Sequence, residues 1–323
     1  MGHNNRLRPL GVSVIICCYN SANNILKVLQ HVESQQCIAF PLEVVVVDNN
    51  SKDDTAIVVT SFCKETSLDV KLVYEPKPGL MYARECGLNA SKYEFIQFCD
   101  DDNLLSSNYI TTLYNFLYYD SSLGACGGKG IALIENKEPI WFRKYSRSYA
   151  VGSQLKKPQD HLYGAGMAIR YSALLNVYEK GFESFLTGRK GDVLLAGDDG
   201  ELVLALMLTG YKLKASDDIY FDHIIPEERL TIRYLLKLHE GFGMMYPVID
   251  IYREVLKQKK LNHEFWYNLL FIKKTLLSLS SVIFKNGVDR AVQFSLFKGH
   301  VKGLIYFFKK KRAIREVIIK IMK

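Results

Sequence analysis

Short, almost uninterrupted apolar runs alternate with amphipathic segments over the first 120 residues. The runs are rich in β-branched residues, as expected for buried strands, and lie within 12–18, 42–50, 71–76 and 94–99. The segments that follow them carry apolar residues at helical spacing or open with polar capping residues, at 25–34, 51–65, 79–91 and 106–119. Continuously apolar strands that alternate with helices are typical of a parallel sheet covered on both faces. We therefore expect a doubly wound α/β fold with a mostly parallel sheet.

Polar side chains stand where three of these strands are expected to end. They are Tyr19 and Asn20 after the first strand, Asp48 after the second, and Asp100, Asp101 and Asp102 after the fourth. Each could by itself cap a turn or a helix. However, the carboxyl ends of parallel strands open onto one crevice, where such sheets bind ligands. We therefore expect a ligand site at this edge of the sheet.

The acidic triplet at 100–102 indicates a bound cation. Adjacent carboxylates repel one another by about 1 kcal/mol even in water, and by more where solvent is scarce. Mg²⁺ or Mn²⁺ would neutralise the triplet and assist a diphosphate leaving group, because these ions prefer oxygen ligands and often share substrate phosphates. The chain has neither a GxxxxGK[ST] loop nor a GxGxxG turn after its first strand, so ordinary P-loop and dinucleotide folds are not supported.

A second acidic cluster precedes an apolar helical pattern within residues 197–213. Asp198 and Glu201 have the spacing of a capping box, and Gly210 would end the helix. A capping box does not require the further carboxylate of Asp199. Two interpretations stay open for this segment: a helix cap, or a site in which Asp199 faces the crevice as a general base.

The chain divides near residue 225 into an acidic body and a basic tail. Of 42 Lys and Arg and 34 Asp and Glu, residues 226–323 hold 20 and 8, which leaves 22 and 26 for residues 1–225. The tail has a helical pattern throughout, in which apolar and aromatic residues mix with Lys and Arg. We expect a binding and catalytic domain at 1–225 and a basic helical region at 226–323.

The composition favours a cytoplasmic protein. The seven cysteines show no CxxC spacing, which fits free thiols in a reducing compartment better than a disulfide framework or a zinc site. The N-terminal sequence has no apolar signal region, and no stretch reaches 18 uninterrupted apolar residues. We therefore expect neither a signal peptide nor a spanning helix.

Five segments resemble, in order and spacing, the signatures of the family 2 glycosyltransferases, which have the GT-A fold. They are SVIICCYNSANNI (13–25), VVVVDNNSKDDT (44–55), GLMYARECGLNAS (79–91), FCDDDN (98–103) and GDDGELVLALMLTGYKL (197–213). The resemblance covers residues 11–225. It implies transfer of a sugar from a nucleotide-diphosphate donor, usually a UDP-sugar, with inversion at the anomeric carbon. The acceptor would be a saccharide or a lipid-linked glycan in surface glycan synthesis.

The resemblance assigns the donor site to residues at strand ends. The nucleotide would contact Tyr19, Asn20, Asp48, Asn49 and Arg84. Asp100 and Asp102 match the outer positions of the DxD motif, with Asp100 toward the ribose and Asp102 on the metal. Asp101 stands between them, at a position that is often uncharged in the family, and would also border the donor.

The resemblance also implies a base, a further metal ligand and an acceptor side. Asp199 matches the catalytic base, and Asp198 stands where the family commonly has Glu. His223 falls where many relatives place a histidine near the metal or diphosphate, although a histidine at a strand end can also be purely structural. The acceptor side would involve Trp141, Gly166 and Met167.

The basic tail leaves three interpretations open. Its helices could pack on the body with their lysines in water, lie on an anionic membrane surface at the inner face, or bind nucleic acid. The last is disfavoured, because the aromatic residues are grouped with aliphatic ones instead of being spread as stacking platforms. A non-catalytic nucleotide- or glycan-binding protein that the tail recruits to membranes is the alternative to an enzyme. A nucleotidyltransferase would need a glycine-rich basic loop where this chain has CCYNSANN.

Overall fold

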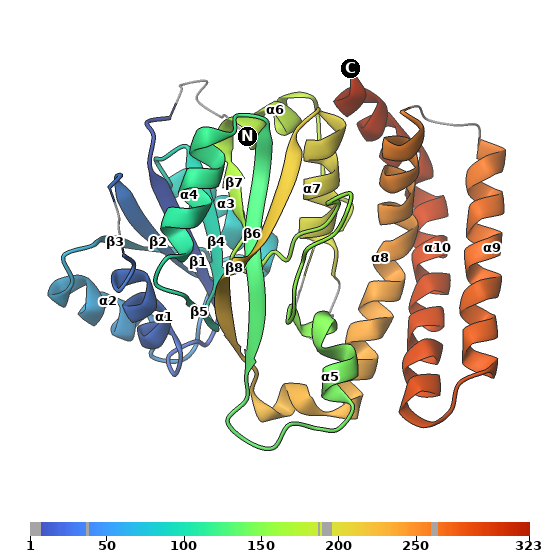
Figure 1. The fold of residues 1–323 in the computed structure, drawn as a ribbon, viewed down its shortest axis with the longest axis horizontal. Coiled ribbons are helices and arrows are strands. Elements are labelled where there is room, and N and C mark those ends of the chain that lie inside the picture. The colour runs from blue at the N-terminus through green and yellow to red at the C-terminus, as the bar shows by residue number, and fades with distance from the viewer. Residues whose placement is uncertain (1–7, 37–38, 187, 189–195, 260–263) are drawn as a thin grey trace. The chain divides into compact units, whose positions relative to one another are not determined.

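The computed structural model describes residues 8–36, 39–186, 188, 196–259 and 264–323, with the backbone alone at 264–270. The chain forms two compact units (Figure 1). The sheet unit comprises the described residues up to 133 together with 149–176 and 210–225, and the helical unit comprises 134–148, 177–209 and 226–323. The expected boundary at 225 coincides with one border between these units. Two segments ahead of that boundary belong to the helical unit.

The strands of the described residues form one sheet in the order β3-β2-β1-β4-β7-β6-β8-β5. They are β1 (Val12–Cys18), β2 (Leu42–Asp48), β3 (Asp69–Tyr74), β4 (Phe95–Asp100), β5 (Asn103–Leu105), β6 (Leu123–Leu133), β7 (Ala168–Arg170) and β8 (Lys212–Ile224). β1 is parallel to β2 and β4, β2 to β3, and β6 to β8. The short strands β5 and β7 run antiparallel to their neighbours. The expected α/β fold with a mostly parallel sheet is confirmed.

Helices cover both faces of β1. On one face, α1 (Ile25–Glu33), α2 (Thr55–Glu65) and α4 (Tyr109–Tyr119) share a core with Val14 and Ile16. On the other face lies α3 (Leu80–Ala90), where a Cβ on Gly87 would overlap the side chain of Ile15. Successive strand residues point to opposite faces, so a strand covered on both sides is apolar at every position. This arrangement explains the continuous run VSVIICC.

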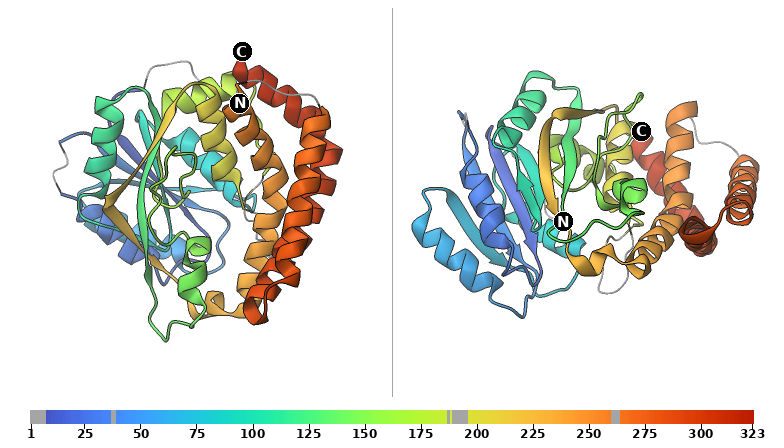
Figure 2. Two further views of the ribbon diagram at one scale, coloured as in Figure 1. Left: turned by 45° about the vertical axis from the view of Figure 1, so that its right-hand side comes forward. Right: turned by 60° about the horizontal axis from the view of Figure 1, so that its bottom comes forward.

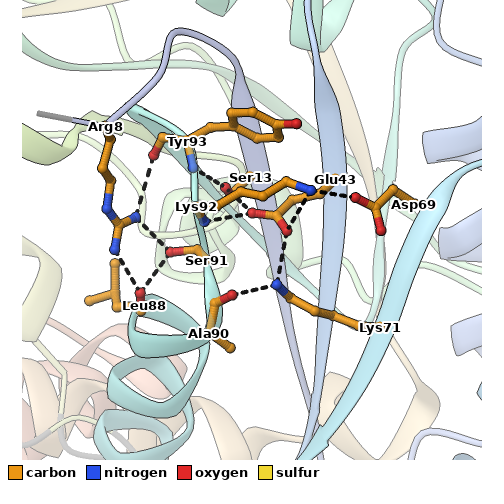
Figure 3. Close-up of polar contacts among 10 residues, drawn as sticks. All are labelled: Arg8, Ser13, Glu43, Asp69, Lys71, Leu88, Ala90, Ser91, Lys92 and Tyr93. Carbon is orange, nitrogen blue, oxygen red and sulfur yellow. Dashed lines mark hydrogen bonds and ion pairs between the residues drawn. The ribbon is translucent and has the colours of Figure 1, made fainter.

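A polar network joins the amino ends of β1, β2 and β3 (Figure 3). Glu43 of β2 is buried, and its Oε1 accepts hydrogen bonds from Ser13 Oγ at 2.6 Å and from the Lys92 N–H at 2.7 Å. Its Oε2 lies 2.9 Å from Lys71 Nζ on β3. A buried carboxylate is tolerated when it is paired and hydrogen-bonded in this way. These contacts bind the strands together at the sheet edge remote from their carboxyl ends.

The helical unit contains the long C-terminal helices (Figure 2). Its elements are α5 (Phe142–Tyr145), α7 (Asp198–Leu208), the 3-10 turn at Glu227–Leu230, α8 (Ile232–Gln258), α9 (Glu264–Ile283) and α10 (Gly287–Met322). α6 (Tyr171–Glu179) begins in the sheet unit and ends in the helical unit, and a 3-10 turn at Ser146–Tyr149 follows α5. Within the described residues, none of the helices combines the length and the apolar character that crossing a membrane requires.

Glycines allow α8 and α10 to approach closely. A Cβ on Gly243 of α8 would overlap the carbonyl of Leu296, and a Cβ on Gly299 of α10 would overlap the carbonyl of Glu240. A Cβ on Gly303, one turn further along α10, would also overlap the backbone of α8. Backbone atoms of the two helices therefore contact each other directly, which larger residues at these positions would prevent.

Candidate active site

The carboxyl ends of β1, β2 and β4 lie side by side. In the parallel register, Cys18 of β1 is opposite Asp48 of β2, and Cys17 is opposite Asp100 of β4. Tyr19, which follows β1 directly, therefore leaves the sheet beside both carboxylates. The structure brings these polar residues to one edge, as the alternation of strands and helices indicated.

Asp48 and Asn49 hold the loops around this edge. Asp48 is buried, and its Oδ1 accepts a hydrogen bond from the Ser51 N–H at 2.9 Å. Asn49 Nδ2 donates to the carbonyl of Lys77 at 2.8 Å, and Asn49 Oδ1 accepts from the Gly79 N–H at 2.8 Å. Both polar groups of the Asn49 side chain thus join the loop after β2 to the loop that precedes α3.

Asp101 fixes the turn after β1. Its Oδ2 accepts a hydrogen bond from the Tyr19 N–H at 3.3 Å and another from Ser21 Oγ. Asn20 has a left-handed φ of 53°, and its N–H donates to Ser51 Oγ at 3.0 Å. The Tyr19 side chain is exposed, so its ring is accessible to a planar group such as a nucleobase. The middle acid of the triplet therefore shapes the site through the backbone.

Charges of both signs surround the end of β1. Burial raises the pKa of the Cys17 thiol to about 12, the cationic Arg84 opposes this shift, and the carboxylates of Asp100 and Asp101 add to it. Arg84 lies on α3, with its guanidinium carbon 5.2 Å from the ring centroid of Phe98. A guanidinium suits phosphate oxygens, whereas clustered carboxylates suit a divalent cation.

Asp102 and His223 form a buried pair beside this edge. His223 lies on β8 opposite Asn103 of β5, and its Nε2 is 3.5 Å from Asp102 Oδ2. His223 Nδ1 lies 2.7 Å from the carbonyl oxygen of Tyr149. A carbonyl oxygen can only accept a hydrogen bond, so Nδ1 must carry a proton. In the neutral ring, Nε2 therefore directs its lone pair toward a carboxylate.

This pair is suited to a divalent metal ion. Imidazole nitrogen and carboxylate oxygen are both ligands of Mn²⁺, and here the two face each other at 3.5 Å. Over the described residues, no group of three His, Cys, Asp or Glu side chains surrounds a common metal position. Asp102 and His223 would supply two ligands, Asp100 is at the same sheet edge, and substrate phosphates commonly complete such sites.

The first turn of α7 carries Asp198, Asp199 and Glu201. The N-cap is Gly197, with a left-handed φ of 105°, and no side chain in the described part of the chain accepts a capping hydrogen bond there. The structure therefore contradicts the capping box that was one interpretation of this segment. The Asp198 carboxylate lies against Gly188, where a Cβ would be 3.1 Å from Asp198 Oδ2. Asp199 lies where the helix dipole stabilises an anion.

Glu201 has a role that the sequence did not reveal. Its side chain is buried, and its Oε2 accepts hydrogen bonds from Ser184 Oγ at 2.8 Å, the Phe185 N–H at 2.9 Å and the Leu186 N–H at 3.0 Å. Burial raises the pKa of Glu201 to about 7, although these hydrogen bonds favour the ionised form. Its spacing from Asp198 pointed only to a cap, so no local signal indicated that it anchors residues 184–186.

The residues expected on the acceptor side are divided between the two units. Gly166 has a left-handed φ of 69°, and its carbonyl accepts a hydrogen bond from the Tyr109 hydroxyl at 3.1 Å. Met167 is buried, and its carbonyl accepts from the Phe98 N–H at 2.9 Å. Both belong to the sheet unit, whereas Trp141, directly before α5, belongs to the helical unit.

Comparison with known proteins identifies the family. A family model described as glycosyl transferase family 2 matches residues 13–177, which extend from β1 to beyond β7. The chain belongs to glycosyl transferase family 2. The family suggested by the five sequence segments is thereby confirmed.

Curated relatives of this family 2 chain include bacterial proteins of glycan metabolism. It is 26% identical over 126 residues to the glycosyltransferase GlyG of Streptococcus pneumoniae, covering 35% of this chain and 41% of GlyG. It is 24% identical over 201 residues to the succinoglycan biosynthesis protein ExoM of Rhizobium meliloti, covering 61% of each. The chain thus spans less than two thirds of the length of these relatives.

Solved structures share the fold of this family 2 protein. The mannosyltransferase PcManGT from Pyrobaculum calidifontis, in complex with GDP-Man and Mn²⁺, aligns with a TM-score of 0.59 and 17% identity over 93% of this chain and 91% of its own. TarS from S. aureus, in complex with UDP, aligns with a TM-score of 0.51 and 17% identity over 95% and 92%. These similarities show that the chain has the GT-A fold, with a helical C-terminal region.

Proposed function

We propose that this protein is an inverting glycosyltransferase that transfers a sugar from a UDP-sugar to a saccharide or lipid-linked acceptor in surface glycan synthesis. The observation that carries the proposal is the buried Asp102–His223 pair beside the carboxyl ends of the parallel strands. Membership of family 2 supports the reaction class. The nucleotides bound to PcManGT and TarS support a nucleotide donor.

The donor nucleotide would bind at the ends of β1 and β2. The exposed ring of Tyr19 offers a surface for the nucleobase, and Asp48 would accept hydrogen bonds from it. Arg84 on α3 would pair with the diphosphate. Asp101 and Asn49 would act indirectly, because their side chains hold the loops that carry the contacting residues.

Asp100, Asp102 and His223 would hold Mg²⁺ or Mn²⁺. The hydrogen bond between His223 Nδ1 and the Tyr149 carbonyl fixes the ring so that Nε2 is directed at the site. When bound, the ion would stabilise the negative charge that develops on the departing diphosphate. The acidic triplet, whose mutual repulsion called for a cation, would thereby be neutralised in part.

Asp199 would act as the general base. It would take the proton from an acceptor hydroxyl, whose oxygen forms a bond to the anomeric carbon as the bond from that carbon to the diphosphate breaks on the opposite face. The dipole of α7 stabilises an anion at the helix start, and a stabilised carboxylate is a weak base, so alignment of the hydroxyl would contribute much of the rate. Asp198, packed against Gly188, would position the segment before the helix.

Substitution of Asp199 by Asn tests the enzymatic proposal. Purified protein is incubated with a panel of UDP- and GDP-sugars, Mn²⁺ and glycan or lipid-linked acceptors, and nucleoside diphosphate release and sugar transfer are measured. We expect one donor to be used with inversion, and Asp199→Asn to lower kcat by about a thousandfold while the affinity for the donor changes little.

Asp218→Asn, which changes an exposed carboxylate on β8, is the matched control and should retain wild-type turnover. A protein that binds a nucleotide sugar but never transfers the sugar would instead be the non-catalytic binding protein. Retention of the anomeric configuration in the product would contradict the single displacement.

A further inference from the structure

The face of α9 that packs within the helical unit is defined by three side chains. The Phe271 ring lies 4.9 Å from the Phe307 ring of α10, measured between centroids, in an edge-to-face arrangement. Thr275 Oγ1 lies 3.2 Å from His300 Nε2 of α10. Lys274 Nζ lies 2.5 Å from the buried Asp250 of α8. Positions 271, 274 and 275 therefore mark the inner side of α9.

The outer side of α9 is apolar although it is exposed. Ile272, Leu276, Leu279 and Ile283 recur at intervals of four, three and four residues, which places them in one stripe along the helix. Their exposed fractions are 58%, 61%, 41% and 63%. Leu277 and Phe284 extend the patch, with 57% and 84% exposed. Contiguous exposed apolar side chains of this kind mark an interaction surface.

Basic residues lie near this stripe. From residue 271 onward the sequence has 13 Lys and Arg and only 2 Asp and Glu. Lys273 and Lys285 are exposed near the two ends of the stripe. Lys309, Lys310 and Arg312 are exposed on α10, just after Phe308, whose ring lies 6.2 Å from that of Phe271. Exposed Lys and Arg side chains thus lie near both ends of the apolar face and on the neighbouring helix α10.

We propose that the outer face of α9 docks on an anionic phospholipid bilayer, with the helix lying in the plane of the interface. Apolar side chains would enter the acyl boundary, while lysines at its margin extend their charged ends to lipid headgroups. A second copy of the chain is a poorer partner, because apposed α9 faces would bring Lys273 and Lys285 against equally basic surfaces. The inference deepens the proposed function, in which a lipid-linked acceptor resides at such a surface.

Vesicle sedimentation with the full chain tests this inference. Sucrose-loaded vesicles of phosphatidylcholine with phosphatidylglycerol are compared with vesicles of phosphatidylcholine alone. We expect binding to the anionic vesicles that weakens when salt is raised from about 0.1 M to about 0.5 M, because the headgroup attraction is screened. Leu276→Gln/Ile283→Gln should lower the partition coefficient by about tenfold or more, since two exposed anchors lose their apolar burial.

The matched control is Ile57→Gln/Ile140→Gln, which changes two exposed apolar residues outside α9 and should leave the partition coefficient within about twofold. Failure of the wild-type protein to bind anionic vesicles, or equal binding by Leu276→Gln/Ile283→Gln, would overturn the inference. Wild-type dimers that this variant dissociates, without vesicle binding, would assign the face to a second copy instead.

Sedimentation requires no turnover, so the two proposals fail separately. Asp199→Asn should bind vesicles as the wild type does. A protein that binds vesicles but transfers no sugar would refute the glycosyltransferase and leave the membrane surface in place. A protein that transfers sugar to a soluble acceptor but does not bind vesicles would support the glycosyltransferase and overturn the membrane surface.

Discussion

Two acids in the first turn of α7 have different surroundings. Glu201 is enclosed by protein and accepts three hydrogen bonds through one oxygen, whereas Asp199, the second residue of the helix, is only partly buried. The buried acid therefore connects the start of α7 to residues 184–186. We infer that Glu201 supports the position of the helix start, and that Asp199 depends on that support for its own placement.

The titration of Glu201 should make the free energy of unfolding depend on pH. Its pKa is about 7 in the folded chain, above the ordinary value of 4.5, so the native state holds this proton more tightly than the unfolded state does. The stabilisation is complete below pH 4.5 and is lost as pH rises through 7. We expect a decline on the order of 3 kcal/mol in the free energy of unfolding from this group between pH 4.5 and 8, measured by urea denaturation.

In Glu201→Gln, the decline in the free energy of unfolding with pH should be absent. The amide oxygen can still accept hydrogen bonds, but the side chain has no titrating proton. Glu183→Gln, at a nearby exposed acid, is the control and should follow the wild-type pH profile. Parallel pH profiles of the wild type and Glu201→Gln would contradict the assignment.

At this scale the strand-end residues were predictable and Glu201 was not. Asp48 and Asp100 follow continuous apolar runs, and parallel pairing then places strand ends together. The spacing of Asp198 and Glu201 matches a capping box, a purely local signal, whereas the actual partners of Glu201 lie 15 to 17 residues away along the chain. Hydrogen bonds between distant residues leave no periodic pattern for a reader of the sequence to detect.

Among the elements, the pair α8 and α10 depends on glycine. Gly299 and Gly303 lie on one side of α10, and a Cβ at either position would overlap the backbone of α8. Such a contact allows two helix backbones to touch, which increases dispersion contacts between them. Glycine otherwise weakens a helix, so its presence at these positions is explained by packing.

Gly299→Ala should destabilise the protein. Alanine is intrinsically better in a helix by about 1 kcal/mol, but its methyl group has no room against the Glu240 carbonyl, so we expect a net loss of about 2 kcal/mol in the free energy of unfolding. Gly200→Ala in α7 is the matched control. Its nearest neighbour would be Ile249 Cδ1 at 3.5 Å, an ordinary contact, so it should be neutral or stabilising. Equal effects of the two substitutions in chemical denaturation would contradict the close packing.

The helices and strands were more predictable from the sequence than their division between the two units. The run at 12–18 coincides with β1, and the run at 42–50 contains β2, because burial on both faces leaves a continuous apolar pattern. The pattern at 161–170 indicates a strand or turn, and the strand β7 forms within it, at Ala168–Arg170. Segments 134–148 and 177–209 pack with the C-terminal helices, and no property of these segments alone distinguishes that outcome from packing on the sheet.

For the whole molecule, ligand binding should appear as added stability. A ligand at a hundredfold excess over its Kd raises the free energy of unfolding by about 2.7 kcal/mol. We expect UDP to raise the Tm, and UDP with Mn²⁺ to raise it further, because the Asp102–His223 pair would then be neutralised. His223→Ala should keep the increment from UDP alone and lose the increment from Mn²⁺, in differential scanning fluorimetry.

Chelation by EDTA serves as the reference for this comparison and should return the wild-type protein to the Tm seen with UDP alone. An undiminished response of His223→Ala to Mn²⁺ would show that His223 is structural, held by its hydrogen bond to the Tyr149 carbonyl. Absence of any Mn²⁺ increment in the wild type would contradict a metal at this site.

The division of the chain into two units leaves the sheet unit without a tryptophan. The sequence has two tryptophans, Trp141 and Trp266, and both belong to the helical unit. Excitation at the red edge of the aromatic absorption band selects tryptophan and therefore reports on the helical unit. Emission from the sheet unit comes from its tyrosines. Because both tryptophans belong to the helical unit, their combined emission maximum is an intrinsic optical probe of that unit, and no dye needs to be attached.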